Sequence, residues 1–216
     1  MGSGLKLTVA TFAVGFCIAL LLRHPRSIRR IREAFAFGAA AVAGLAITFG
    51  PWAWQLWTHF QNPIFPYANQ WIRSPWWDLY SVPNRVYGPH KIGEWFAFPL
   101  QLLAPSPGYV SEVPYVDARI PLLYSLAILA LAGATIVRLL RGRAEKRPTP
   151  DADARRSAWT LLAVFWVASF LLWTAQHSIV RYIVVLDVLT GVLIVGLLRM
   201  IVRPSSRVPS PLSPSC

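Results

Sequence analysis

The chain is dominated by long uncharged blocks of apolar residues, and these blocks leave few folds open to it. Five of them stand out, approximately Leu5–Leu22, Ala34–Trp57, Ile120–Val137, Ala158–Thr174 and Ile183–Leu198. About 17 to 20 consecutive apolar residues cross the hydrocarbon core of a bilayer as a helix. Strands of a membrane barrel would alternate apolar and polar residues, and no such alternation is seen here. The blocks therefore predict an all-α, polytopic membrane helix bundle of about five transmembrane helices.

Charge is scarce and unevenly placed. Only 14% of the residues are charged, against about 25% in a typical soluble domain. The net charge of +12 comes mostly from three runs, at 23–32, 138–156 and 199–207, which occupy every second connection between the blocks. Cytoplasmic connections carry such an excess of Lys and Arg. This pattern predicts a membrane protein with its N-terminus outside and its C-terminus cytoplasmic. It also favours anionic lipid over nucleic acid as the partner of the basic runs.

The same pattern divides the chain into regions. We predict one transmembrane helical domain over residues 1–203, with an outer loop at 58–119 and a cytoplasmic loop at 138–157. Residues 204–216 are rich in Ser and Pro, which predicts a disordered tail.

The outer loop at 58–119 is unusually long and aromatic for a plain connection. Tryptophan favours the membrane–water interface, so we expect this loop to lie against the outer surface of the bilayer. Its apolar segment at 92–104 is too short to span and contains Pro99. That segment predicts an interfacial or re-entrant helix.

The stretch QNPIFPYANQWIRSPWWD, at 61–78, is the most constrained part of the outer loop. Pro63 and Pro66 fix two φ angles and predict an extended path for the residues between them. Asn69 can satisfy backbone groups where the turn ends. The prediction is a rigid aromatic loop that carries one cation, Arg73. Such a loop serves as a binding surface, or else it only packs against the helix bundle.

Three elements of the sequence resemble parts of one enzyme family. The run NPIFPYANQWIRSP is similar to the N-P-x-F-P-x-x-N and K/R-S-P pattern of bacterial multi-pass glycosyltransferases of the GT-C type. The string SEVPYVDARIPLLY, at 111–124, resembles their loop-to-helix junction, and QHSIVRY, at 176–182, resembles a short outer loop before a late helix. The likeness covers residues 58–124 and 174–198. It implies inverting transfer of a sugar from a polyprenyl-phosphate donor at the outer face of the inner membrane, in cell-envelope glycan assembly.

The resemblance also implies a donor site. A lipid phosphate needs a cation, and the planar guanidinium of arginine can bind two phosphate oxygens at once. The residues expected to bind substrate are Asn62, Phe65, Asn69, Arg73, Arg119, Arg181 and Tyr182. For Arg119 and Arg181 the alternative is a plain position at the membrane surface, with the side chain reaching for water.

An inverting transfer also needs a carboxylate that takes the proton of the acceptor hydroxyl. Asp78 and Asp117 are the candidates in the outer loop, although Asp117 and Arg119 can instead pair with other charges of the loop and only fix the junction. Asp187 lies within the fifth block, where an unpaired carboxylate costs about 3 kcal/mol or more. It predicts either a functional role or a hydrogen bond between helices. The dispersed histidines indicate no metal site, and the sequence indicates no cofactor while leaving a divalent metal open.

One feature of the family is missing from this sequence. GT-C enzymes resemble one another in having an acidic residue in their first large outer loop and more than five helices. Here no Asp or Glu precedes Glu33, which is predicted to be cytoplasmic. We therefore expect either the C-terminal part of a larger enzyme or a reduced relative. The alternative function is a non-catalytic membrane protein that binds or helps to move lipid-linked glycan, or a partner subunit of other membrane proteins. The sugar and the acceptor stay open.

Overall fold

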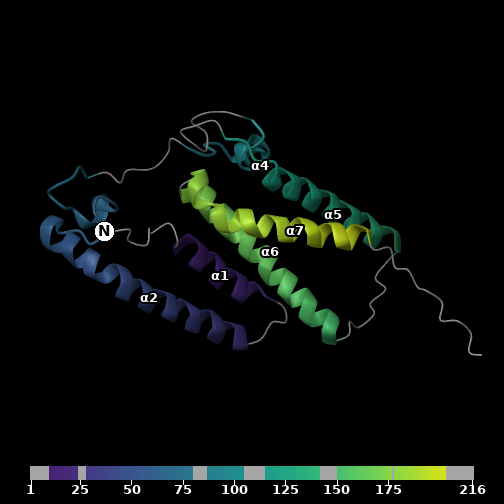
Figure 1. Cartoon of the computed structure of the whole chain (residues 1–216), viewed down its shortest axis with the longest axis horizontal. Coiled ribbons are helices and arrows are strands. Elements are labelled where there is room, and N and C mark those ends of the chain that lie inside the picture. Colours follow the sequence, from purple (N-terminus) through teal and green to yellow (C-terminus); the bar gives the residue numbers. More distant parts are fainter. Residues whose placement is uncertain are drawn as a thin grey trace, which may run out of the picture.

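The computed structural model describes residues 10–23, 28–79, 87–104, 115–141, 150–176 and 178–202 (Figure 1). Its helices are α1 (Ala10–Leu22), α2 (Ile28–Phe60), α3 (Asn69–Ile72), α4 (Ile92–Gln101), α5 (Arg119–Arg141), α6 (Pro150–Gln176) and α7 (Val184–Val202), with the 3-10 turn η2 (Val180–Tyr182) before α7. No strand occurs in these ranges. The prediction of an all-α helix bundle is confirmed.

Four helices are long and apolar enough to cross a membrane. The segments are Ile28–Phe60, Arg119–Leu140, Asp153–Gln176 and Val184–Ile201, which correspond to the last four predicted blocks. The first block differs, because α1 has 13 residues in the described part of the chain. At 1.5 Å per residue it is about 20 Å long, short of the roughly 30 Å hydrocarbon core. The structure therefore has four candidate spans and one shorter apolar helix.

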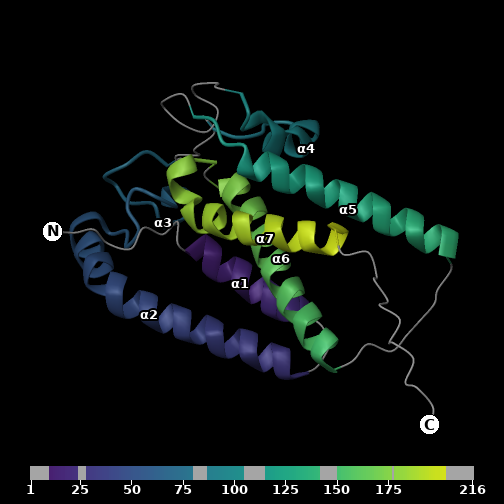
Figure 2. The ribbon, with the colours of Figure 1, turned by 45° about the vertical axis from the view of Figure 1, so that its right-hand side comes forward.

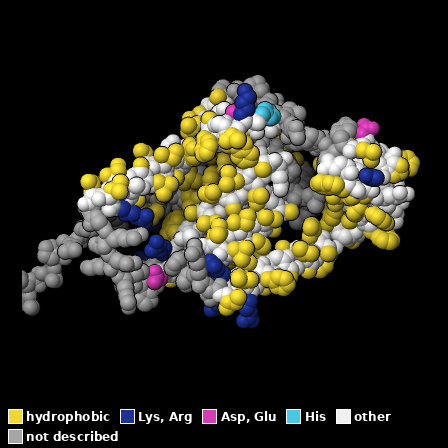
Figure 3. Space-filling view, turned by 180° about the vertical axis from the view of Figure 1, so that it is seen from behind, with side chains coloured by type: hydrophobic (Ala, Val, Ile, Leu, Met, Phe, Trp, Pro, Cys, Tyr) yellow, Lys and Arg dark blue, Asp and Glu magenta, His cyan; other side chains and the backbone are white. Residues whose placement is uncertain are grey.

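The helices alternate in direction, so one end of the bundle gathers several of their termini. The C-terminal ends of α2 and α6 and the N-terminal ends of α5 and α7 are the left-hand ends of these helices in Figure 1. We call this the loop end, because the segment that follows α2 lies there. In the predicted topology the loop end faces outside. Hydrophobic side chains cover most of the face seen in Figure 3, as a lipid environment requires.

The segment at 92–104 forms the helix α4, as predicted. Its first turn is stabilised by Glu94, whose carboxylate accepts hydrogen bonds from the backbone N–H groups of His90 (2.7 Å) and Lys91 (3.3 Å). These bonds hold the pKa of Glu94 below its usual range. Phe98 and Pro99 are buried, and α4 packs against the start of α5 (Figure 2).

The main core lies where α4, α5, α6 and α7 meet. On α6 the ring of Trp166 stacks on that of Phe170, with centroids 5.0 Å apart. The indole N–H of Trp166 donates to the hydroxyl of Thr190 on α7 at 3.0 Å. In lipid such a polar contact between helices replaces a bond to water, so it holds α6 and α7 together.

Small residues set the contact between α1 and α6. A Cβ added at Gly15 would lie 2.1 Å from Oγ and 3.2 Å from Cα of Ser169. The two backbones can approach this closely only because residue 15 has no side chain. Membrane helices commonly pack through small residues in this way.

Gly15→Leu should therefore push α1 away from α6. Overpacking of a close contact costs about 1–3 kcal/mol, so the thermal unfolding midpoint of the detergent-solubilised chain should fall. The matched control is Gly133→Leu on α5, because a Cβ at Gly133 meets no atom within 4 Å. Equal midpoints for the two variants would show that Gly15 does not set the packing distance.

Candidate functional site

The proline-rich stretch after α2 folds into successive turns, so the predicted extended path is wrong. The N–H of Phe65 donates to the carbonyl of Asn62 at 3.2 Å, and that of Tyr67 donates to the carbonyl of Ile64 at 3.0 Å. The side chain of Asn62 closes these turns. Its Oδ1 accepts from the N–H of Ile64 at 3.0 Å, and its Nδ2 donates to the carbonyl of Tyr67 at 2.9 Å. An asparagine that bonds the backbone two residues later offers the chain a turn that the prolines do not oppose.

Asn69 holds the second half of the same loop. Its Oδ1 accepts from the N–H of Ser74 at 2.7 Å. Its Nδ2 lies 3.1 Å from the carbonyl of Ser74, 2.8 Å from that of Trp77 and 3.1 Å from that of Asp78. The hydroxyl of Ser74 donates to the carbonyl of Phe60 at the end of α2. The prediction that Asn69 satisfies backbone groups at the end of the turn is confirmed.

The two predicted binding asparagines are thus part of the support of the loop. Asn62 and Asn69 are both 0% exposed, and their amides are bonded to backbone. Phe65 also packs the loop onto α2, since its ring stacks on Phe60 with centroids 4.2 Å apart. The exposed side chains that this support carries include Trp71, Arg73, Trp76, Trp77 and Asp78.

Replacing Asn69 with Ala should loosen the loop without unfolding the bundle. The change leaves the buried N–H of Ser74 without its partner, which costs about 1–3 kcal/mol. Hydrogen exchange at residues 69–78 should speed up, while exchange in α6 stays unchanged. Asp78→Asn is the control, because only the backbone carbonyl of Asp78 takes part in the network. Unchanged exchange in Asn69→Ala would show that the loop is held by other contacts.

A second group of predicted residues meets where α5 and α7 begin. The carboxylate of Asp117 accepts hydrogen bonds from Arg119, namely from its backbone N–H at 2.8 Å, its Nε at 3.1 Å and its Nη2 at 2.6 Å. The hydroxyl of Tyr115 donates to the same carboxylate at 2.9 Å. The backbone N–H of Asp117 donates to the carbonyl of Leu102, just after α4, at 3.0 Å. Asp117 is 7% exposed, and it ties α4 to α5.

Asp187 joins this group from α7. Its Oδ2 lies 3.5 Å from Nη2 of Arg119, and its side chain is 13% exposed. Its Oδ1 is buried without a hydrogen-bond partner in the described part of the chain. Asp187 therefore makes an ion pair between helices, with Arg119 on α5, in place of the hydrogen bond that one of the two sequence hypotheses expected.

Burial and hydrogen bonding fix the protonation states around Asp117. Burial, and then the hydrogen bond to Asp117, raise the pKa of Tyr115 to about 12. Burial works to raise the pKa of Asp117 as well. The hydrogen bonds from Arg119 and Tyr115 outweigh it and leave that pKa below its usual range. At neutral pH Asp117 is an anion whose oxygens are already occupied, and Tyr115 is its neutral donor.

Asp117 should make the stability of the chain depend on pH. Because its pKa is lower in the folded chain than the value of about 3.9 in an unfolded one, its contribution is present above about pH 4 and is lost as the pH falls through the folded value. Asp117→Asn should unfold at a lower temperature than the wild type at pH 7, and the gap should narrow below about pH 4. The exposed Asp78→Asn should show no such gap. If the difference in unfolding temperature between the wild type and Asp117→Asn does not change with pH, this role is ruled out.

Arg181 and Tyr182 lie in η2, between α6 and α7. The guanidinium of Arg181 is exposed and sits 5.2 Å from the ring centroid of Tyr182, whose ring packs against the main core. The turn is fixed from α6, because the indole N–H of Trp173 donates to the carbonyl of Ile179 at 3.0 Å. Ser178, which is fully buried, packs against Gly88.

The three favoured arginines therefore differ in what they can offer a ligand. Arg119 is engaged by Asp117 and Asp187. Neither Arg73 nor Arg181 has an ion pair with any other residue that the structure describes. Of the three favoured arginines, only Arg73 and Arg181 thus offer a charge that no carboxylate of the described residues neutralises.

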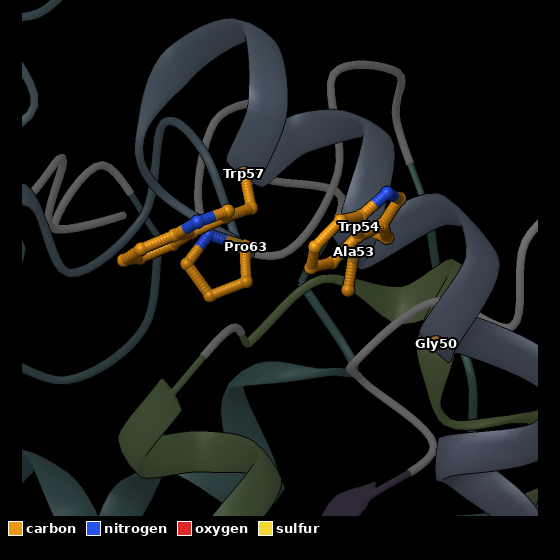
Figure 4. A pocket seen from close by; sticks show the side chains of 5 residues that line it. All are labelled: Gly50, Ala53, Trp54, Trp57 and Pro63. Atoms are coloured by element: carbon orange, nitrogen blue, oxygen red, sulfur yellow. The ribbon is translucent and has the colours of Figure 1, made fainter.

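A shallow apolar groove also lies near the loop end (Figure 4). It has a volume of about 370 Å³ and is lined by Gly50, Ala53, Trp54, Trp57 and Pro63. Its lining carries no charged side chain, so it includes neither the two exposed arginines nor the residues around Asp117. Within the described residues, no three His, Cys, Asp or Glu side chains gather as metal ligands would.

Sequence reasoning missed Tyr115 and the pairing of Arg119 with Asp187. Tyr115 stands in the string PYVDAR, two residues before Asp117, and that spacing was the available signal. Nothing in the sequence pointed to the meeting of α5 and α7. Two further charged residues of the predicted outer loop, Arg85 and Glu112, lie outside the described residues.

The fold and its apolar surface define the chain as a polytopic helical membrane protein. No family model, curated protein or solved structure matches the chain.

Proposed function

We propose that the loop end binds the phosphate of a polyprenyl-linked sugar at the outer face of the inner membrane, and that the chain takes part in transfer of that sugar. The membrane setting follows from the four candidate spans. The ligand and the reaction are those implied by the resemblance of residues 58–124 and 174–198 to GT-C glycosyltransferases.

One observation carries the proposal. Arg73 and Arg181 are exposed at the loop end, each stands on a locally fixed support, and neither has an acidic partner in the described ranges. The support of Arg73 is the Asn69 network, and that of Arg181 is the turn bonded to Trp173. A fixed backbone lowers the conformational entropy that these residues lose when they bind phosphate, and each guanidinium can donate two parallel hydrogen bonds.

The surroundings of Arg73 suit an amphipathic ligand. Trp71, Trp76 and Trp77 are exposed on the same loop. Tryptophan rings of this kind lie in the interface, where a lipid headgroup meets its hydrocarbon chain. A polyprenyl phosphate carries a charged phosphate next to an apolar chain. Arg73 would bind the phosphate, and the exposed tryptophan rings around it would contact the chain.

Binding without transfer is the second candidate function. It is favoured by the state of Asp117, one of the two predicted bases, because the oxygens of its carboxylate are occupied by Arg119 and Tyr115. Asp78, the other predicted base, is exposed on the loop.

Binding is tested with the full chain in nanodiscs and a polyprenyl monophosphate as the probe, followed by tryptophan fluorescence. Arg73→Ala and Arg181→Ala should each raise the Kd roughly tenfold, because each removes a charge-assisted hydrogen bond to the phosphate. The Kd of Arg73→Lys should lie between those of the wild type and Arg73→Ala, because lysine keeps the positive charge but lacks the planar guanidinium.

Two controls make the result specific. Arg138→Ala removes a cation from the far end of α5 and should leave the Kd unchanged. The uncharged polyprenol should bind the wild type and both alanine variants alike. Equal affinity of the wild type for the phosphate and the alcohol would refute the proposed function.

A further inference from the structure

Two carboxylates share one guanidinium where α5 and α7 begin. Arg119 makes its short hydrogen bonds to Asp117 and approaches Asp187 only to 3.5 Å. Within the described residues no other cation pairs with either carboxylate. Once Asp117 has neutralised Arg119, one negative charge is left over, and it rests on Asp187.

Asp187 also lacks hydrogen bonds that other buried polar groups of this chain have. Its Oδ1 is shielded from solvent and has no partner among the described residues. Side-chain atoms of Arg30, Gln101, Ser169 and Thr174 share this state, and Oδ1 of Asp187 is the only carboxylate oxygen of the five. A shielded carboxylate oxygen without a donor is costly, and such groups in folded proteins call for an explanation. A ligand hydroxyl would supply the missing donor.

The position of Asp187 fits a ligand held at the loop end. Asp187 lies in the first turn of α7, and η2, which carries the exposed Arg181, directly precedes that helix. The side chain is 13% exposed, and rotation about its last torsion exchanges its two oxygens. Neither Asp117 nor Asp78 combines a free oxygen with this shielding.

We infer that Asp187 is the general base of the proposed sugar transfer, with Arg119 and Asp117 as the residues that position it; this inference rests on the proposed function. The acceptor O–H bond breaks, and its proton passes to the carboxylate of Asp187. The acceptor oxygen uses the freed electron pair to bond to the anomeric carbon. The bond from that carbon to the phosphate oxygen breaks, and polyprenyl phosphate leaves with the electron pair.

Water can stand in for the unidentified acceptor, so the test follows release of free sugar. The full chain in nanodiscs is given a polyprenyl-phosphate hexose that is labelled in the sugar. Asp187→Asn should slow release by about 10²- to 10⁴-fold, as expected when a general base is lost. Its Kd for polyprenyl monophosphate should stay within about twofold of the wild-type value, because the positive charges are untouched.

Further variants separate a base from a structural role. Release by the wild type should fall as the solution is acidified, and the residual release by Asp187→Asn should lose that dependence. Asp187→Glu should restore part of the rate with a shifted pH profile. Asp153→Asn, at the opposite end of α6, should release sugar at the wild-type rate.

Failure of the inference and failure of the proposed function give different results. If the wild type binds polyprenyl monophosphate but releases no sugar, or if Asp187→Asn releases it at the wild-type rate, the base role is overturned and binding stands. If the wild type shows no preference for the phosphate, the proposed function fails and the base role fails with it. Should Asp187→Asn not fold, an unchanged pH profile in Asp187→Glu overturns the inference.

Discussion

A bilayer offers no hydrogen-bond partners, and this constraint decides where polar chemistry can occur in this protein. Within the candidate spans, Trp166 and Thr190 meet this constraint by a hydrogen bond between α6 and α7. The denser polar networks lie at the loop end, around Asn69 and around Asp117. Sites for charged ligands are therefore expected where the helices end, and both groups described above are found there.

Hydropathy alone predicted the helical class, because the bilayer imposes a length and a composition on every span. The last four blocks became candidate spans, and α4 formed where a short apolar segment contains Pro99. Local turn chemistry predicted the role of Asn69, since its partners lie within a few residues. The extended path between the two prolines failed for a local reason too, because the side chain of Asn62 supplied a competing acceptor.

Long-range pairing could not be predicted in the same way. Arg119 and Asp187 belong to segments far apart in the chain, and their meeting depends on the packing of α5 beside α7. Hydropathy gives the existence of both helices but neither their neighbours nor their rotation. Arg119 pairs with two carboxylates only because the tertiary fold brings them together. For this reason we place the expected phosphate contact at Arg73 and Arg181.

The attachment of α2 has a consequence for these two cations. α2 packs chiefly against α1, and near its N-terminal end Glu33 pairs with Arg23 at 2.7 Å. The loop that carries Arg73 is attached to the other end of α2 by a ring stack and a hydrogen bond. The position of the loop therefore follows the position of α2 on α1. Arg181 lies instead in η2, between α6 and α7. The distance between the guanidinium groups of Arg73 and Arg181 thus depends on the contact between α1 and α2. That contact lies away from both groups, within the apolar part of the bundle.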